Sequence, residues 1–370
     1  MSEYQYYEFA AVDRALDKRE LDQLRALSTR AHITPTSFVN TYEWGNFRGD
    51  PRALMERYFD AFLYLANWGT HELMLRVPAR LVDLDTAQLY CVGDAARAWS
   101  RGEHVIVSAS SEDAEADFDW GGEGVLASIL PVRSELVSGD LRALYLLWLM
   151  SVQSGEVEDG TLEPPVPPGL GALTGSQAAL AEFLRIDADL LRAAAVASGP
   201  DQQGDPAREL AAWIEGLPAT DRDELLLELL RGEDPHLRAV TLRRARPSAG
   251  ASSGDRSAGQ LLDAARARRL ERERAEQHRR DAAAAERAKH AAAVRERRLA
   301  ALAAEGDGVW HRIDALIAAK KPAEYDTAVG ILEDLSEVSA DEDFSRRIGE
   351  LRLEHRRKPA LMARLDRAGL

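Results

Sequence analysis

The stretch QLLDAARARRLERERAEQHRRDAAAAERAKHAAAVRERRLAALAAE, residues 260–305, sets the architecture of the second half of this chain. It consists mainly of Ala, Arg and Glu and contains neither Pro nor Gly. These residues are strong helix formers, and Glu276 precedes Arg280 by four positions, the favourable orientation for an ion pair along a helix. The composition predicts one helix over 260–304. At 1.5 Å per residue, roughly 40 residues would form a rod of about 60 Å.

This predicted helix lacks the apolar seam of a coiled coil. Leu270 stands alone, and the next large apolar residues are Val294 and Leu299. A coiled coil needs apolar residues at successive a and d positions, which this spacing does not provide. We therefore expect a single helix that is solvated or docked only in part.

Charge is unevenly distributed along the chain. The 370 residues carry a formal net charge of −15, which argues against a protein that coats nucleic acid with its whole surface. The net charge is −13 for residues 1–163, −8 for 164–235, +9 for 236–299 and −3 for the remainder. An anionic partner would therefore bind the basic segment.

The cations of the long helix are the candidate binding residues. Residues 264–299 contain 12 cations and 6 acids: Arg266, Arg268, Arg269, Arg272, Arg274, Arg279, Arg280, Arg287, Lys289, Arg295, Arg297 and Arg298 are the cations. Arg on several faces of a helix can contact phosphates without reading bases, and the lack of aromatics argues against base stacking. Alternatively, the mixed charge keeps an Ala-rich helix extended, or presents it to an acidic protein surface such as the N-terminal domain.

The first 153 residues alternate strand-like and helix-like patterns, which predicts an α+β domain. Strands are expected at 4–12, 36–44, 72–77, 104–108 and 116–120. Asp17 with Glu20 predicts a capping box, and Asp50-Pro51 predicts a second helix start. Apolar residues at i, i+4 spacing extend this second helix towards Gly69. A buried helix is expected over 140–152.

The remaining chain is expected to be mainly α-helical. Pro and Gly in 154–175, and Ser and Gly in 247–259, predict linkers. Between them short helices are expected at 176–184, 187–197, 206–216, 221–231 and 235–245, with a core formed by Trp213, Ile214, Leu217, Leu225, Leu226, Leu227, Leu229 and Leu230. After the long helix, three apolar stripes in 305–370 predict a helical hairpin module.

Catalytic and metal-binding residue types show no diagnostic spacing. No phosphate-binding loop is present, and we expect no cofactor and no metal. Cys91, the single cysteine, excludes an intrachain disulfide and is expected to be buried. His32, His71 and His104 each begin a predicted strand, so the sequence leaves open whether they cluster at one edge.

The acidic residues Asp113, Glu115, Asp117 and Asp119 alternate with apolar side chains. An EF-hand loop needs Gly at its sixth position and Glu at its twelfth, where this chain has Phe118 and Gly124. The alternation therefore predicts a solvated strand face.

Location and function follow only as expectations. The N-terminus shows no signal-peptide pattern, and the longest uncharged apolar stretch, 143–150, is too short for a membrane span of about 20 residues. We expect a cytoplasmic chain without a membrane partner.

The leading hypothesis for the function is a non-enzymatic interaction or scaffold protein that docks a protein partner through its helical rod and helical hairpin. The alternatives are an accessory factor of nucleic-acid machinery binding through 264–299, and an enzyme with a carboxylate or histidine site in 1–150.

Overall fold

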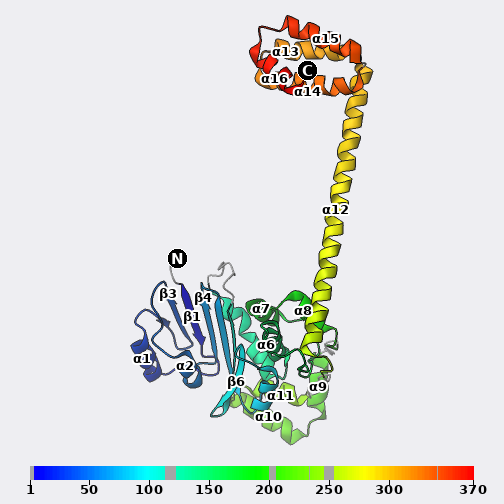
Figure 1. The fold of residues 1–370 in the computed structure, drawn as a ribbon. Coiled ribbons are helices and arrows are strands. Elements are labelled where there is room, and N and C mark those ends of the chain that lie inside the picture. The colour runs from blue at the N-terminus through cyan, green and yellow to red at the C-terminus, as the bar shows by residue number, and fades with distance from the viewer. Residues whose placement is uncertain (1–3, 113–121, 200–205, 233, 246–253, 340) are drawn as a thin grey trace. The chain divides into compact units, whose positions relative to one another are not determined.

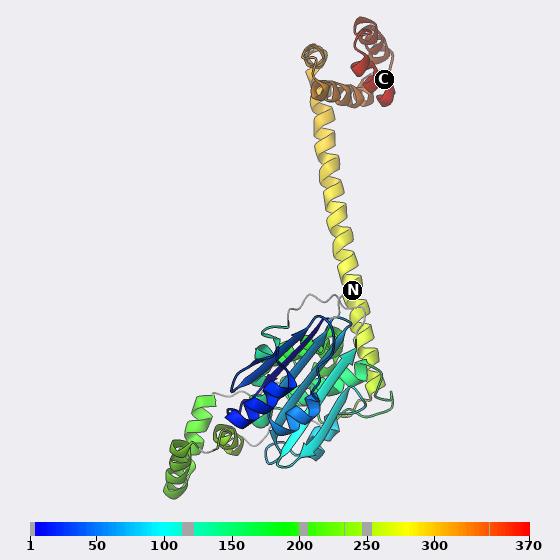
Figure 2. The ribbon, with the colours of Figure 1, turned by 90° about the vertical axis from the view of Figure 1, so that its left-hand side faces the viewer.

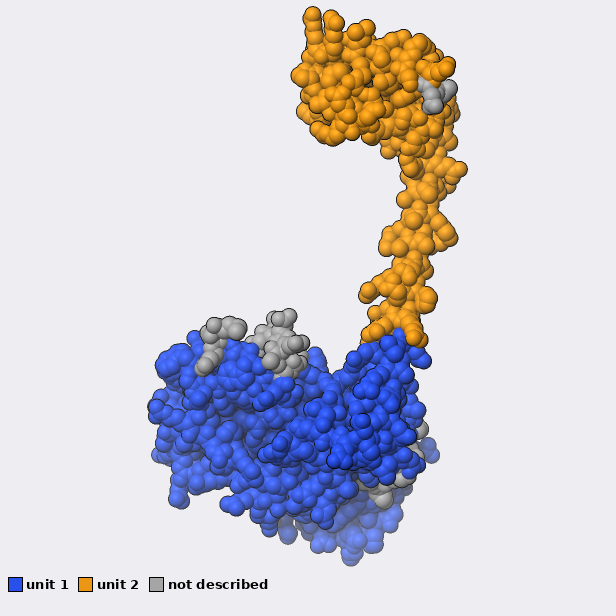
Figure 3. All heavy atoms as spheres, in the orientation of Figure 1, with its two compact units in different colours: residues 1–271 blue, residues 272–370 orange. Residues whose placement is uncertain are grey.

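The computed structural model describes residues 4–112, 122–199, 206–232, 234–245, 254–339 and 341–370. Packing divides the chain into two compact units, residues 1–271 and 272–370, which are coloured separately in Figure 3. Each unit has its own apolar core. The finer division into six segments stays a prediction.

Unit 1 is built on a seven-stranded sheet whose paired strands all run antiparallel, in the order β2-β3-β1-β4-β5-β7-β6. The strands are β1 (Gln5–Ala10), β2 (His32–Ile33), β3 (Ser37–Tyr42), β4 (Ala61–Ala66), β5 (Thr70–Pro78), β6 (Ala96–Arg101) and β7 (His104–Glu112). Four predicted strands are thereby confirmed. The strand predicted at 116–120, with the acidic residues Asp113, Glu115, Asp117 and Asp119, lies outside the described residues.

Helices cover both faces of this sheet (Figure 1). On one face lie α1 (Lys18–Leu27) and α2 (Pro51–Arg57), which face the viewer in Figure 2. They pack over a cluster rich in aromatic rings that includes Phe9 and Phe62. Leu63 and Leu65 of β4 point to the opposite face, into a second cluster shared with α6. Because both faces are buried, the central strand β4 is apolar throughout.

Both predicted helix starts are confirmed. The Asp17 carboxylate accepts from the backbone N–H of Glu20 at 2.8 Å, and the Glu20 carboxylate accepts from the backbone N–H of Asp17 at 2.9 Å. The expected extension of α2 towards Gly69 is wrong, because α2 ends at Arg57 and is followed by strand β4. An apolar run that is buried on both sides cannot be assigned to helix or strand by periodicity alone.

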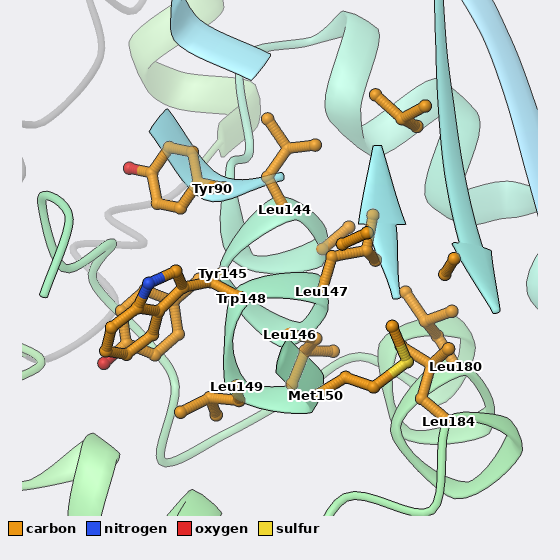
Figure 4. Close-up of a cluster of buried hydrophobic side chains, with 14 of the residues drawn as sticks. Tyr90, Leu144, Tyr145, Leu146, Leu147, Trp148, Leu149, Met150, Leu180 and Leu184 are labelled. Carbon is orange, nitrogen blue, oxygen red and sulfur yellow. The ribbon is translucent and has the colours of Figure 1, made fainter. Parts of the chain in front are cut away.

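The helix between β5 and β6 and the helices from β7 to Ala245 are short. They are α3 (Leu84–Tyr90), α4 (Val125–Ile129), α5 (Pro131–Val137), α6 (Arg142–Gln153), α7 (Gly175–Phe183), α8 (Ala188–Ala195), α9 (Pro206–Gly216), α10 (Ala219–Arg231) and α11 (Leu237–Ala245). The buried helix predicted at 140–152 is confirmed as α6, of which 11 residues are buried. In Figure 4, Leu147 points towards the sheet while Tyr145 and Trp148 lie together on the other side of α6.

Residues 154–175, where Pro and Gly predict a linker, contribute to the packing of unit 1. Val166 and Leu170 are buried, and the buried carboxylate of Glu163 accepts two hydrogen bonds of 2.8 Å from Arg256 and one of 2.8 Å from Tyr145. These contacts fasten the chain just before the long helix to unit 1.

The predicted long helix is confirmed as α12 (Ala258–Glu305), continuous over 48 residues. Its first turns are packed in unit 1, where Ala258 and Leu261 are buried. Near its end, Leu302 belongs to the core of unit 2. Each end of α12 is therefore held by an apolar core.

Unit 2 is helical. After the end of α12 it contains α13 (Asp307–Ala318), α14 (Pro322–Val338), α15 (Asp341–Glu354) and α16 (Pro359–Ala368). The apolar stripes predicted in the sequence form its core, with Ile313, Leu332 and Ile348 among the buried residues. Leu361 and Leu365 of α16 complete this core, so four helices pack where a hairpin was expected.

The leucines expected to form the core of the 206–245 region are mostly exposed. The short helices of this region are confirmed, but no residue of α10 is buried. Leu230 is 81% exposed and Leu226 is 56% exposed, while Trp213 and Leu217 of the same predicted core are half-buried. The prediction failed because leucine content indicates a helix face without indicating which element covers it.

Candidate functional site

The candidate cations lie along α12 between its two packed ends. Every side chain from Gln277 to Arg298 is exposed, so this part of the helix presents its full circumference to solvent. Arg269 ion-pairs with Asp187 at the start of α8, within unit 1. Arg295 pairs with Glu337 and Arg298 with Asp334, both on α14 within unit 2. Three of the cations therefore form ion pairs that hold the ends of α12 against α8 in unit 1 and α14 in unit 2.

Three more cations pair with acids of α12 itself. The pairs are Arg266–Asp263 at 3.0 Å, Arg272–Glu276 at 3.5 Å and Lys289–Glu286 at 3.1 Å. Exposed pairs of this kind contribute about 0–1 kcal/mol each, since both ions remain hydrated. Their main effect is to reduce the positive potential along the helix.

The other six cations have no ion pair among the described residues: Arg268, Arg274, Arg279, Arg280, Arg287 and Arg297. At 100° per residue, Arg268, Arg279 and Arg297 fall within about 20° of one another around the helix axis. They therefore form one row on one side of α12, while the others point elsewhere. Arg279 and Arg297 of this row are exposed to an anionic partner, whereas Arg268 is half-buried.

The structure does not bring the three strand-entrance histidines together. His32 is exposed on β2, at the edge of the sheet. His71 and His104 lie near opposite ends of the paired strands β5 and β7, since His71 is opposite Ser111 and His104 is opposite Pro78. Within the described part of the chain, no group of three His, Cys, Asp or Glu side chains could hold a metal ion.

A second polar cluster, which sequence reasoning missed, surrounds a cleft of about 710 Å³ in unit 1. The cleft lies where β5 ends and β7 begins, beside the segment that leads into α11. The charged and imidazole side chains that line it are Asp13, Arg14, Arg80, Glu103, His104, Asp234 and His236.

Asp13 and His236 form the centre of this cluster. His236 Nε2 lies 3.0 Å from Asp13 Oδ2, and Arg133 donates to both Asp13 oxygens at 2.7 and 2.5 Å. Burial alone would raise the pKa of Asp13, but the hydrogen bonds from His236 and Arg133 outweigh it and hold that pKa well below its usual value. Asp13 is therefore ionised and orients the imidazole.

The buried ion pair between Arg76 and Asp60 holds the backbone next to this cluster in place. Arg76 donates to Asp60 Oδ1 at 2.8 and 3.1 Å, and the other oxygen of Asp60 accepts from the backbone of Val12 at 2.7 Å and of Asp13 at 3.0 Å. Asp60 is 1% exposed. These bonds fix the backbone that carries Asp13.

A carboxylate-oriented imidazole at a cleft can act as a general base. Burial, reinforced by the charge of Arg76, lowers the pKa of His104, which keeps the second imidazole of the cleft neutral at pH 7. In the described residues, no Ser, Thr or Cys side chain lines this cleft to serve as a nucleophile. The arrangement could therefore activate water or orient a polar ligand.

No sequence signal could have found this cluster, because Asp13 and His236 are 223 residues apart and belong to no motif.

The prediction that Cys91 is buried is confirmed, and burial raises the pKa of its thiol to about 12. A thiol with such a pKa is protonated at neutral pH and is a poor nucleophile.

Comparison with known proteins finds no family model, no curated protein and no solved structure that matches this chain. The function must therefore be inferred from the residues themselves. Among the described helices, none combines the length and the apolar character needed to cross a membrane.

Proposed function

We propose that this chain is a non-enzymatic, cytoplasmic interaction protein that docks a protein partner through α12 and the helices of unit 2. The observation that supports this most directly is the exposed stretch of α12 from Gln277 to Arg298, which lies between ends packed in two separate cores. Such a stretch buries no apolar surface of its own, so its persistence as a helix depends on the packed ends.

The charge pattern of α12 also supports a protein partner. Its cations alternate with acids along the helix, and half of them already have an acidic partner. A surface of mixed charge gives specificity through complementary pairs, whereas a polyanion would favour cations alone.

Site-specific photo-crosslinking in the native cell tests the proposal. A crosslinker is placed at Ala284 on α12 and at Leu353 on α15, which is 67% exposed. Leu89 on α3 of unit 1, 55% exposed, is the matched control. We expect one protein to crosslink at Ala284 or Leu353 and not at Leu89. Crosslinks from Leu89 alone would contradict the proposal.

A second candidate function is phosphate binding through 264–299, as an accessory factor of nucleic-acid machinery. The row of Arg268, Arg279 and Arg297 favours it, because these cations have no acidic partner among the described residues. Fluorescence anisotropy with a labelled DNA duplex should show binding that weakens steeply with salt. The triple change of this row to Gln should reduce the salt slope by about 3. Arg266→Gln, at a paired cation, is the control, and equal slopes for both variants would exclude this function.

An enzymatic function is the third candidate, favoured by the oriented imidazole of His236 in the cleft. Its test is hydrolysis of small chromogenic esters and phosphates by the full chain and by His236→Gln. Turnover that is lost in the variant while the fold is retained supports catalysis, and turnover that persists argues for a contaminant.

A further inference from the structure

Helix α10 (Ala219–Arg231) presents a leucine surface of which only Leu225 is half-buried by the described chain. Leu226, Leu227 and Leu229 are 56%, 53% and 61% exposed, and Leu230 is 81% exposed. No residue of α10 is buried. A cluster of exposed leucines on one helix marks a site of interaction, whereas isolated exposed leucines are common.

Four of the leucines form one face with a charged border, and Leu227 lies about 60° beyond Leu230 around the helix axis. At 100° per residue, Leu225, Leu226, Leu229 and Leu230 span about 140° of the helix circumference. Asp221, Glu224 and Glu228, all exposed, follow one another along the edge beside Leu225 and Leu229 at spacings of three and four residues. This surface, the leucine face and its acidic border, is called the α10 face below.

We propose that the α10 face docks an amphipathic helix of another protein, with a leucine stripe bordered by Lys or Arg. A partner helix would cover the leucines by the knobs-into-holes packing of paired helices. Its cations would meet the row of acids, which gives the pair its register and its specificity. The α10 face contains no residue of α12 or unit 2, so this inference goes beyond the proposed function and does not depend on it.

Charge argues against a second copy of this chain as the occupant. In an antiparallel pair of α10 helices, the acidic border would face the same border of its partner, and like charges disfavour that pairing. The two cations of α10, Arg222 and Arg231, stand near its opposite ends and form no row. Anionic lipid is disfavoured for the same reason, because helices that lie on membranes carry Lys and Arg on their polar side.

Fluorescence anisotropy with the full chain tests the inference. The probe is a labelled 18-residue synthetic helix with a leucine stripe bordered by Lys, and the matched probe has Glu in place of Lys. We expect the Lys peptide to bind at least about 10-fold more tightly than the Glu peptide, or about 1.4 kcal/mol. The double variant L226D/L230D should lose binding. Leu89→Asp, at a leucine of nearly equal exposure on α3, is the control and should retain it.

Replacing acids of the α10 face by lysines distinguishes binding at this face from a general attraction of the Lys peptide to an acidic protein. E224K/E228K should reverse the preference, so that the Glu peptide binds more tightly. The same exchange at two exposed acids of unit 2, E333K/E354K, should leave the preference for the Lys peptide unchanged.

Several results would overturn the inference. One is equal binding of both peptides, and another is binding that survives L226D/L230D. A dimer in analytical ultracentrifugation that this double variant converts to monomer would assign the α10 face to a second copy. Adsorption to phosphatidylcholine–phosphatidylserine vesicles without peptide binding would assign it to lipid.

Discussion

Helices α6 and α10 are both rich in leucine, yet they have opposite environments. In α6, 11 residues are buried between the sheet and the surrounding helices, whereas in α10 no residue is buried. The leucines of α6 and of α10 are chemically the same, so the difference comes from the surrounding elements. Leucine content therefore predicts where apolar surface is available, and tertiary packing determines whether the chain itself uses it.

The largest effect is expected inside α6. Trp148 is 1% exposed, and Trp148→Ala should lower the free energy of unfolding by about 3–5 kcal/mol, because truncation loses burial and leaves a cavity. Trp44, which is 67% exposed, is the matched control, and Trp44→Ala should change stability far less. Urea unfolding followed by far-UV circular dichroism measures both. Equal losses for the two variants would contradict the assigned burial.

A smaller effect is expected where α6 meets the chain before α12. Tyr145 donates a 2.8 Å hydrogen bond to the buried carboxylate of Glu163, which also binds Arg256. Tyr145→Phe should cost about 1.5–3 kcal/mol, the range for a hydrogen bond to a charged group. Urea unfolding measures it, with Tyr325→Phe on α14 as control. A Tyr145→Phe variant as stable as the wild type would show that Arg256 alone satisfies Glu163.

The packed and exposed regions should also differ in their response to acid. The folded pKa of Asp13 lies below the unfolded value of about 4, so its contribution to stability is complete above pH 4 and is lost as pH falls further. Asp13→Asn should flatten the stability profile below pH 4, by at most one proton, or about 1.4 kcal/mol per pH unit. Asp221→Asn on exposed α10 is the control. Thermal unfolding between pH 2 and 6 measures both, and parallel profiles would refute the assignment.

The smallest effect is expected on α10. Leu230→Ala should change the free energy of unfolding by no more than about 0.5 kcal/mol, because its side chain is already in solvent. Denaturant unfolding of the full chain measures it. A loss above about 2 kcal/mol would mean that Leu230 is packed, and the contrast between α6 and α10 would disappear.

Local sequence features predicted local structure well. The capping box of Asp17 and Glu20, the Asp50-Pro51 start and the Ala/Arg-rich composition of α12 act within a few residues, and the structure confirms each. Strands β2 and β6 and helices α3, α4 and α5 were missed, because they are short and their patterns are weak.

The candidate sites differ in how far the sequence could reveal them. The cations of α12 were visible as a change of net charge along the chain. Which six of them form ion pairs within the described residues depends on contacts such as Arg295–Glu337. The pair Asp13–His236 was not visible, since 223 residues separate its members and no motif connects them.

By itself the sequence determined the helix starts, the long helix, the apolar stripes of unit 2 and the basic segment between acidic ones. Capping, helix propensity and local charge depend on neighbours along the chain, which is why they can be read there. The tertiary structure alone decided that residues 61–66 form a central strand, that His236 meets Asp13, and that the leucines of α6 are buried while those of α10 are not. Burial depends on which distant element supplies the covering surface, and no pattern within a single helix specifies that element.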